Sequence, residues 1–213
     1  MQLIDDSGRS HALALETDSA DYHVLTNAVK RIKHVKGILC EMGTRRGGSL
    51  ALIVSALLDN EDLYRNVVCI DPYGNIEYSH REGVVSKLDY TNQMRNECMI
   101  SIYAFLLNRP VNVVFHCLED TEFFNRYDDG VPFYNETKTV ETKYALVFFD
   151  GPHDKKSILR EIDFFHRRSA EGAMWIFDDL SFYDHDAIER VLFDKGWSLV
   201  EKTGVKGSYT NAT

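Results

Sequence analysis

The sequence predicts an α/β protein: a Rossmann-like, doubly wound and mostly parallel sheet of about seven strands, with helices on both faces and an antiparallel C-terminal strand. Short apolar runs rich in β-branched residues alternate along the chain with segments whose apolar residues recur at helical spacing. The strand-like runs are too apolar to have a face in water. That pattern indicates a parallel sheet covered on both sides.

The predicted elements follow one another in this alternation. Apolar runs predict strands at residues 37–41, 66–71, 111–117, 144–150 and 173–179. Helical spacing predicts helices at residues 19–34, 47–59 and 91–108, in a segment after residue 150, and at residues 184–195. Asp18 or Ser19 can cap the first helix. Residues 197–210, which contain a glycine turn, predict a closing pair of strands.

The length of 213 residues favours a single domain, residues 1–213. Within it we expect residues 1–17 to form an N-terminal arm. Residues 122–143 mix aromatic and charged side chains without periodicity and interrupt the alternation. A stretch of that length in a compact domain predicts a lid or an insertion loop.

The 33 acidic and 24 basic residues leave a formal charge of -9, which argues against a nucleic acid partner. The N-terminus lacks a secretory pattern, and no apolar run approaches the roughly 18 residues of a membrane span. The four cysteines, Cys40, Cys69, Cys98 and Cys117, show no ligand spacing, so we expect buried thiols in a reducing compartment. These observations predict a cytoplasmic protein without a membrane partner, and they leave a homo-oligomer open.

Acidic residues end all five predicted strands of the alternation. They are Glu41, Asp71, Glu119 or Asp120, Asp150, and Asp178 with Asp179. Ligands of open parallel sheets bind beyond the carboxyl ends of the strands. The sequence therefore predicts a binding site at this edge of the sheet.

The turn between the first strand and its helix has the pattern E-x-G-x-x-x-G-x-S, made by Glu41, Gly43, Gly47 and Ser49. Glycine lets a ligand approach the backbone, and the free N–H groups of the helix attract anionic groups. A dinucleotide fold would carry G-x-G-x-x-G instead. The alternative is a tight turn that binds no ligand.

This turn, followed by Asp71 at the end of the second strand, resembles that of the class I methyltransferases that use S-adenosylmethionine. The resemblance implies that the glycine turn holds the methionine part of the cofactor and that Glu41 faces its amine. It also implies that Asp71 binds the two ribose hydroxyls. A carboxylate suits that role because it can accept two hydrogen bonds from a vicinal diol.

Later motifs are similar to those of the metal-dependent small-molecule O-methyltransferases related to macrocin O-methyltransferase and the cephalosporin-hydroxylase-like group. The motifs are DPYGN at 71–75, HCLEDT at 116–121, FFDGPHD at 148–154 and DD at 178–179. By this resemblance Tyr73 and Asp120 belong to the cofactor site, with Asp120 near the adenine. Asp150, Asp178 and Asp179 would hold Mg²⁺ or a similar divalent cation, which would relieve the repulsion among them. The alternative is that Asp178 and Asp179 cap the following helix.

The resemblance implies an S-adenosylmethionine-dependent O-methyltransferase that acts on a hydroxyl of a small molecule, such as a sugar or a natural-product glycoside. The metal would polarise the acceptor oxygen while His153, or Asp150, removes its proton. The alternative for His153 is a solvent-facing residue at a helix entry. Two other functions stay open: an NAD-dependent oxidoreductase, and a non-catalytic module that only binds the cofactor.

Overall fold

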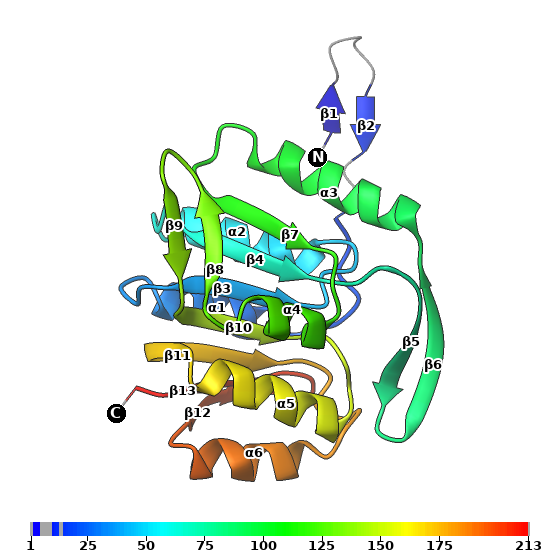
Figure 1. Cartoon of the computed structure of the whole chain (residues 1–213), viewed down its shortest axis with the longest axis vertical. Helices are drawn as coiled ribbons and strands as arrows, with labels where there is room; N and C mark the ends of the chain where they lie inside the picture. The colour runs from blue at the N-terminus through cyan, green and yellow to red at the C-terminus, as the bar shows by residue number, and fades with distance from the viewer. Residues whose placement is uncertain (1, 5–9, 13–14, 213) are drawn as a thin grey trace.

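A seven-stranded sheet forms the centre of the computed structural model, which describes residues 2–4, 10–12 and 15–212 (Figure 1). The strand order is β12-β13-β11-β10-β3-β4-β7. Neighbours from β11 to β7 are parallel, whereas β13 is antiparallel to both of its neighbours. The bounds are β3 Ile38–Met42, β4 Asn66–Ile70, β7 Asn112–His116, β10 Tyr144–Phe149, β11 Ser169–Phe177, β12 Ser198–Lys202 and β13 Gly207–Thr210. The predicted fold class is confirmed.

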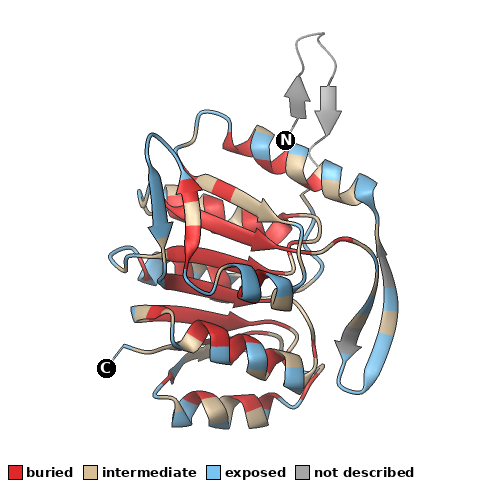
Figure 2. Ribbon diagram, in the orientation of Figure 1, coloured by how far each residue is buried: buried red, intermediate tan, exposed pale blue. Residues whose placement is uncertain are grey.

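Three helices pack on each face of the sheet, and the strands between them are buried (Figure 2). The helices of one face are α1 His23–Arg31, α2 Gly48–Asp59 and α3 Asn92–Leu106. Those of the other face are α4 Asp120–Arg126, α5 Lys155–His166 and α6 His185–Asp194. The apolar residues of α5 show why it forms: Ile158, Ile162 and Phe165 recur at helical spacing and are buried against the sheet.

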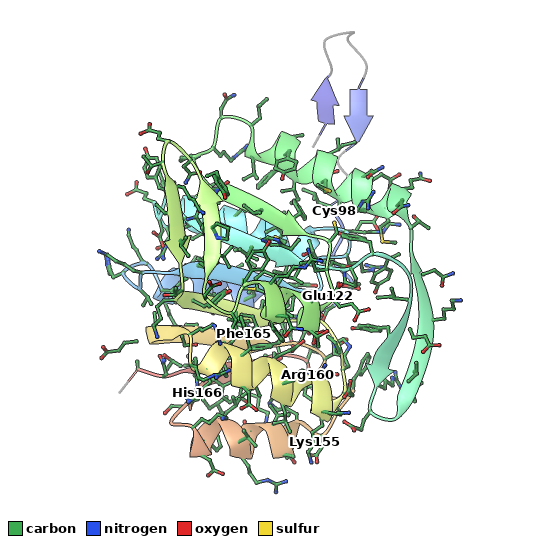
Figure 3. The ribbon with its side chains drawn as sticks, viewed as in Figure 1. Cys98, Glu122, Lys155, Arg160, Phe165 and His166 are labelled. Carbon is green, nitrogen blue, oxygen red and sulfur yellow. The ribbon has the colours of Figure 1, made fainter. Side chains whose placement is uncertain are left out.

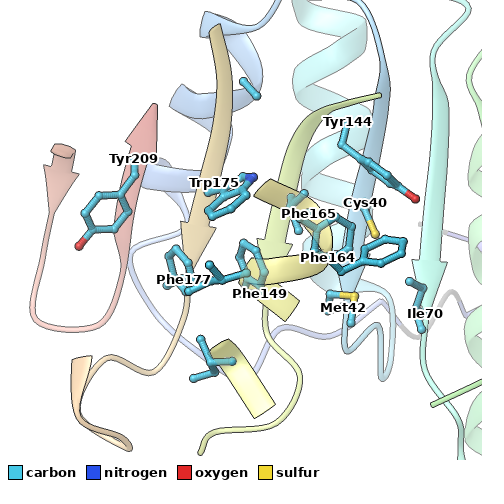
Figure 4. Packing of buried hydrophobic residues seen from close by; sticks show 14 of the residues in the cluster. Cys40, Met42, Ile70, Tyr144, Phe149, Phe164, Phe165, Trp175, Phe177 and Tyr209 are labelled. Atoms are coloured by element: carbon cyan, nitrogen blue, oxygen red, sulfur yellow. The ribbon is translucent and has the colours of Figure 1, made fainter. Parts of the chain in front are cut away.

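Aromatic side chains dominate the core between the sheet and α5 (Figure 4). The rings of Phe149 and Phe177 stack with centroids 4.4 Å apart, and Phe165 packs edge-on against Phe149. Because Phe149 and Phe177 are the last residues of β10 and β11, this packing fixes the carboxyl ends of both strands. Asp150 and Asp178 follow directly.

Two helix caps that the sequence allowed, one as a prediction and one as an alternative, are not formed. Helix α1 begins at His23 and has Tyr22 at its N-cap without a side-chain hydrogen bond, because the Ser19 hydroxyl donates to Asp178 instead. Helix α6 is capped by Asp184, whose carboxylate accepts the Ala187 N–H. Asp178 and the residue after it therefore do not cap that helix.

Residues 74–90 form an antiparallel hairpin that was not predicted, with strands β5 Gly74–Arg81 and β6 Val84–Tyr90. It follows β4 and stands beside the carboxyl ends of the central strands (Figure 1). Its turn is attached on two sides. The Glu82 N–H donates to the Phe182 carbonyl over 3.0 Å, and the Glu82 carboxylate accepts the Lys155 N–H over 2.8 Å.

The segment predicted as a lid or an insertion loop, 122–143, contains most of α4 and a hairpin of β8 Val131–Tyr134 and β9 Lys138–Glu141. Its role stays a prediction. Of the predicted N-terminal arm, residues 1, 5–9, 13 and 14 lie outside the described residues, and the described part includes the pair β1 Gln2–Ile4 and β2 Ser10–Ala12.

Three of the four cysteines are buried as predicted, but Cys117 is exposed because it lies beyond the end of β7, in the turn before α4. All four are free thiols. Within the described ranges, no helix has the length and apolar character to cross a membrane.

Candidate active site

A cavity of about 470 Å³ lies beyond the carboxyl ends of β3, β4, β10 and β11, where the sequence predicted a site. The hairpin β5–β6 and the start of α4 contribute to its wall, as does Arg160 of α5 (Figure 3). The predicted site residues that line it are Gly43, Ser49, Asp71, Asp120, Asp150, His153 and Asp179. Glu41, Gly47, Tyr73 and Asp178 are predicted site residues that lie behind this wall.

The glycines of the turn are required by close packing. Gly43 has a φ of 85°, and a Cβ added there would lie 2.0 Å from the Asp150 carbonyl oxygen. Gly47 is the N-cap of α2 with a φ of 75°, and its Cβ would lie 3.0 Å from Cys98 Sγ. Glycine alone therefore lets the ends of β3 and β10 touch, which brings the glycine turn and Asp150 to the same cavity.

Glu41 is the last buried carboxylate before this turn, with 0% of its surface exposed. Among the described residues, no donor makes a hydrogen bond of ordinary geometry to either of its carboxylate oxygens. Burial raises the pKa of Glu41 to about 7, although the hydroxyls of Ser49 and Thr44 lie close enough to oppose that rise. A buried carboxylate in this state fits a positively charged partner, such as the amine of S-adenosylmethionine.

Asp71 is held in place by two backbone donors. The Arg45 N–H donates to Oδ2 over 2.8 Å, and the Tyr73 N–H donates to Oδ1 over 3.0 Å. Each oxygen keeps a further lone pair, so the carboxylate can still accept both hydroxyls of a diol. Tyr73 also donates its hydroxyl to the Arg45 carbonyl over 2.7 Å. Tyr73 therefore positions Asp71 and does not itself line the cavity.

Asp120 lies at the first position of α4 and lines the cavity between this helix and the glycine turn. Its Oδ1 accepts the Thr121 N–H over 2.7 Å. Burial raises its pKa, and its Oδ2 has no hydrogen-bond partner in the described part of the chain. That oxygen is available to accept a hydrogen bond from a ligand, which fits a donor such as an exocyclic amine.

The three aspartates predicted to bind a metal lie in different surroundings. Asp178 is fully buried and forms an ion pair with Lys206, whose Nζ lies 2.7 Å from both carboxylate oxygens. Asp150 and Asp179 line the cavity instead. Among the described residues, no three acidic, histidine or cysteine side chains are arranged to hold a metal ion. The donor set therefore does not fit the predicted divalent cation, and the metal remains a prediction from the sequence.

Asp150 is a partly buried carboxylate at the cavity wall, with 16% of its side chain exposed. Burial raises its pKa well above the ordinary value, and the neighbouring charges of Asp178 and Asp18 raise it further, while Lys206 opposes them. Asp150 therefore binds a proton more tightly than an exposed carboxyl does.

His153 has only 5% of its surface exposed, so the alternative of a solvent-facing histidine is wrong. Its Nε2 lies 3.7 Å from Asp179 Oδ2 and 4.0 Å from Asp150 Oδ1. Its Nδ1 lies 3.3 Å from the hydroxyl of Tyr78, which is also hydrogen-bonded to the Gly151 carbonyl. The imidazole is thus held at the cavity wall by groups from three segments.

Sequence reasoning missed two parts of this site. It assigns no strands to the segment around Tyr78, although Gly83 separates two runs that contain alternating apolar residues and pair as a hairpin. It places Lys206 only within a closing pair of strands. No local signal marks this lysine, because its partner Asp178 is 28 residues away in the chain.

The mostly parallel sheet with an antiparallel last strand, and the cavity that the glycine turn and Asp71 line at its carboxyl edge, agree with the resemblance to the class I S-adenosylmethionine-dependent methyltransferases. The comparison with protein families agrees, since the family described as "Methyltransferase domain" matches residues 40–180. The chain belongs to this family and is an S-adenosylmethionine-dependent methyltransferase. No curated protein matches the chain in sequence.

Solved structures share the fold at low sequence identity. The O-methyltransferase NovP is similar with a TM-score of 0.61 at 17% identity, over 90% of this chain and 79% of that chain. The calicheamicin methyltransferase CalS11 has a TM-score of 0.56 at 16% identity, over 88% and 77% of the two chains. TomG from Streptomyces achromogenes, solved with S-adenosylmethionine, has a TM-score of 0.56 at 12% identity, over 93% and 82%.

Proposed function

We propose that the protein transfers a methyl group from S-adenosylmethionine to a hydroxyl of a small molecule, such as a sugar or a natural-product glycoside. The observation that carries the proposal is the place of His153, whose buried imidazole lines the same cavity as Asp71. A proton acceptor beside a cofactor pocket is what transfer to a hydroxyl requires.

The acceptor class has support from the cavity and from the structural neighbours. Acidic side chains outnumber the two arginines of the lining, Arg45 and Arg160, which disfavours a phosphate-rich acceptor and favours a neutral one. CalS11 is described as a TDP-rhamnose 3'-O-methyltransferase, and TomG as an enzyme of tomaymycin synthesis. Both descriptions concern small molecules, which supports that broad class, but the diphosphate of TDP-rhamnose differs from the neutral acceptor that the lining of this cavity favours.

Each cofactor-binding residue of this chain would have its own role. Glu41 receives the cofactor amine, Asp71 accepts the ribose hydroxyls, and Asp120 accepts a hydrogen bond from the adenine. The bound cofactor supplies an activated methyl group. Holding it in line with the acceptor oxygen accounts for much of the rate increase expected of such an enzyme.

His153 would take the acceptor proton on Nε2. We infer this tautomer from Tyr78, because a hydroxyl that donates to the Gly151 carbonyl is left to accept the Nδ1–H of His153. In that tautomer Nε2 carries the basic lone pair, and it lies between Asp150 and Asp179. Negative charge on Asp179 stabilises the imidazolium that forms.

The proposed mechanism has no step through the divalent cation that the sequence predicted. The three aspartates predicted to bind that cation, Asp150, Asp178 and Asp179, do not form one ligand set. Asp178 accepts hydrogen bonds from Lys206 behind the cavity wall instead. The proton is removed by His153 alone. A cytoplasmic location, a homo-oligomer, and the absence of nucleic acid and membrane partners remain predictions from the sequence.

Isothermal calorimetry with S-adenosylhomocysteine and with NAD⁺ distinguishes a methyltransferase from an oxidoreductase. If the proposal is right, S-adenosylhomocysteine should bind and NAD⁺ should not. Methyl transfer is then measured by mass spectrometry on a panel of neutral glycosides, nucleotide sugars and catechols. A mass increase of one methyl group on a glycoside hydroxyl supports the proposal. Tight cofactor binding without transfer to any hydroxyl acceptor in the panel would favour a non-catalytic module.

A further inference from the structure

The ion pair between Lys206 and Asp178 is a fully buried pair of charges at the carboxyl end of the sheet, with 0% of either side chain exposed. The register of β13 explains its formation. Phe177 of β11 is opposite Gly207 of β13 in the antiparallel ladder, so the next residues outward, Asp178 and Lys206, are also opposite each other. Opposite charges in this position stabilise the pairing of the two strands.

All three N–H groups of the Lys206 ammonium have acceptors. They are Asp178 Oδ1 and Oδ2, each at 2.7 Å, and Ser19 Oγ at 2.8 Å. The ring of Tyr22 lies 4.2 Å from the same nitrogen, which adds a cation–π contact. The ammonium is therefore held from the end of β11 and from the segment that leads into α1.

The Asp178 carboxylate also accepts hydrogen bonds from other groups. Besides Lys206, its Oδ1 accepts the Ser19 hydroxyl over 3.0 Å and the Asp179 N–H over 2.7 Å. The last of these bonds shapes the turn after β11, where Asp179 has a φ of 51°. Through this bond Lys206 and Asp178 position the Asp179 carboxylate beside His153.

We propose that Lys206 is a built-in substitute for the divalent cation of metal-dependent O-methyltransferases, so that this chain keeps the three aspartates of such a site but needs no metal. A hard cation requires oxygen ligands at about 2.0–2.6 Å, and the ammonium already occupies both oxygens of Asp178. Its positive charge also repels a second cation from the neighbouring carboxylates. Lys206 is a positioning residue in this role, since it lies behind the cavity wall.

Metal binding tests this directly, using Mn²⁺ as the probe and electron paramagnetic resonance together with thermal unfolding as readouts. We expect the wild-type protein to bind no Mn²⁺ at millimolar concentration and to keep its melting temperature when Mn²⁺ or EDTA is added. Lys206→Ala frees the Asp178 carboxylate to join those of Asp150 and Asp179, so this variant should bind about one Mn²⁺ per chain and be stabilised by it through mass action. Adding Asp178→Asn to that variant should remove the gained binding.

Lys202→Ala is the matched control. It removes a lysine from β12, the strand that pairs with β13, and breaks a partly exposed ion pair with Glu189, so it should behave as the wild type toward Mn²⁺. If Lys206→Ala does not fold because Asp178 is left buried and unpaired, the Lys206→Met, Asp178→Asn double variant removes both charges. That variant should fold, still without a response to Mn²⁺.

Stoichiometric Mn²⁺ binding by the wild type that Asp179→Asn abolishes would overturn the proposal, as would a folded Lys206→Ala variant that binds no Mn²⁺. One consequence of this proposal depends on the proposed function: methyl transfer by the wild-type protein should continue in the presence of EDTA. Calorimetry with S-adenosylhomocysteine distinguishes the two hypotheses. If the wild-type protein does not bind S-adenosylhomocysteine, the proposed function is wrong, whereas the Mn²⁺ measurements still test the role of Lys206.

Discussion

Replacing Glu41 with glutamine should stabilise the free protein and weaken its cofactor binding at the same time. The pKa of this carboxyl is 4.5 in an exposed setting and about 7 in the fold. A pKa raised by folding means that the associated stability is fully present below about pH 4.5 and is lost as the pH rises through about 7. At about 1.4 kcal/mol per tenfold change in the ionisation constant, the loss amounts to about 3 kcal/mol.

Glu41→Gln removes this ionisation, so urea unfolding without cofactor should show the variant about as stable as the wild type at pH 4.5. At pH 7.5 it should be more stable by up to about 3 kcal/mol. Cofactor binding should change in the opposite direction. Loss of a hydrogen bond to a charged group costs about 1.5–3 kcal/mol, which corresponds to a dissociation constant for S-adenosylhomocysteine about 10- to 150-fold higher at pH 7.5.

The pH dependence of binding gives a second readout. With a pKa of about 7 in the free protein, the ionised fraction of Glu41 falls about eightfold between pH 7.5 and pH 6, so wild-type affinity should fall by about that factor. Calorimetry on Glu41→Gln should show little change over this range. Glu161→Gln is the control, because Glu161 is also buried with a raised pKa but belongs to α5 and not to the strand that leads into the glycine turn.

Glu161→Gln should therefore gain stability at pH 7.5 and keep wild-type affinity with its pH dependence. The reasoning is refuted if Glu41→Gln binds S-adenosylhomocysteine as tightly as the wild type at pH 7.5. It is also refuted if the variant shows no gain in stability between pH 4.5 and pH 7.5.

Further changes test the remaining parts of the site. Asp71→Ala should weaken S-adenosylhomocysteine binding by about 1.5–3 kcal/mol in calorimetry, and unchanged affinity would exclude the ribose role. His153→Ala should lower kcat by about a hundredfold or more at unchanged cofactor affinity, while near-normal turnover would exclude it as the base. Tyr78→Phe should lower kcat through the orientation of His153, again without an effect on cofactor affinity measured by calorimetry. Gly43→Ala should destabilise the fold, measured by thermal unfolding, because its Cβ would lie 2.0 Å from the Asp150 carbonyl oxygen; an unaltered melting temperature would contradict the close approach of the two strands.

Local patterns in the sequence were sufficient to predict the parallel strands and the acids that end them. Apolar periodicity is a property of neighbouring residues, and the carboxyl ends of parallel strands meet at one edge of a sheet. Glu41, Asp71 and Asp150 could therefore be placed at one edge from their positions in the chain alone. The glycine turn could also be recognised, because its strand, its glycines and its helix are contiguous in the chain.

The hairpin β5–β6, which contributes to the cavity wall, could not be predicted in this way. Residues 74–90 carry only a weak hairpin signal, and their position over His153 depends on contacts of Glu82 with Phe182 and Lys155, which come from other parts of the chain. The burial of His153, and hence its separation from solvent, follows from that packing.

The state of the three aspartates also depended on the fold. Their spacing in the sequence suggested a shared cation, but Asp178 is paired with Lys206 because β13 enters the sheet antiparallel to β11 in one register. A slip of one residue in that register would turn Lys206 to the other face of the sheet and leave Asp178 unpaired. Neither the neighbour of a strand nor its register is encoded in local periodicity. Both are set by which pairing buries the apolar faces of the strands and leaves no charge alone in the core.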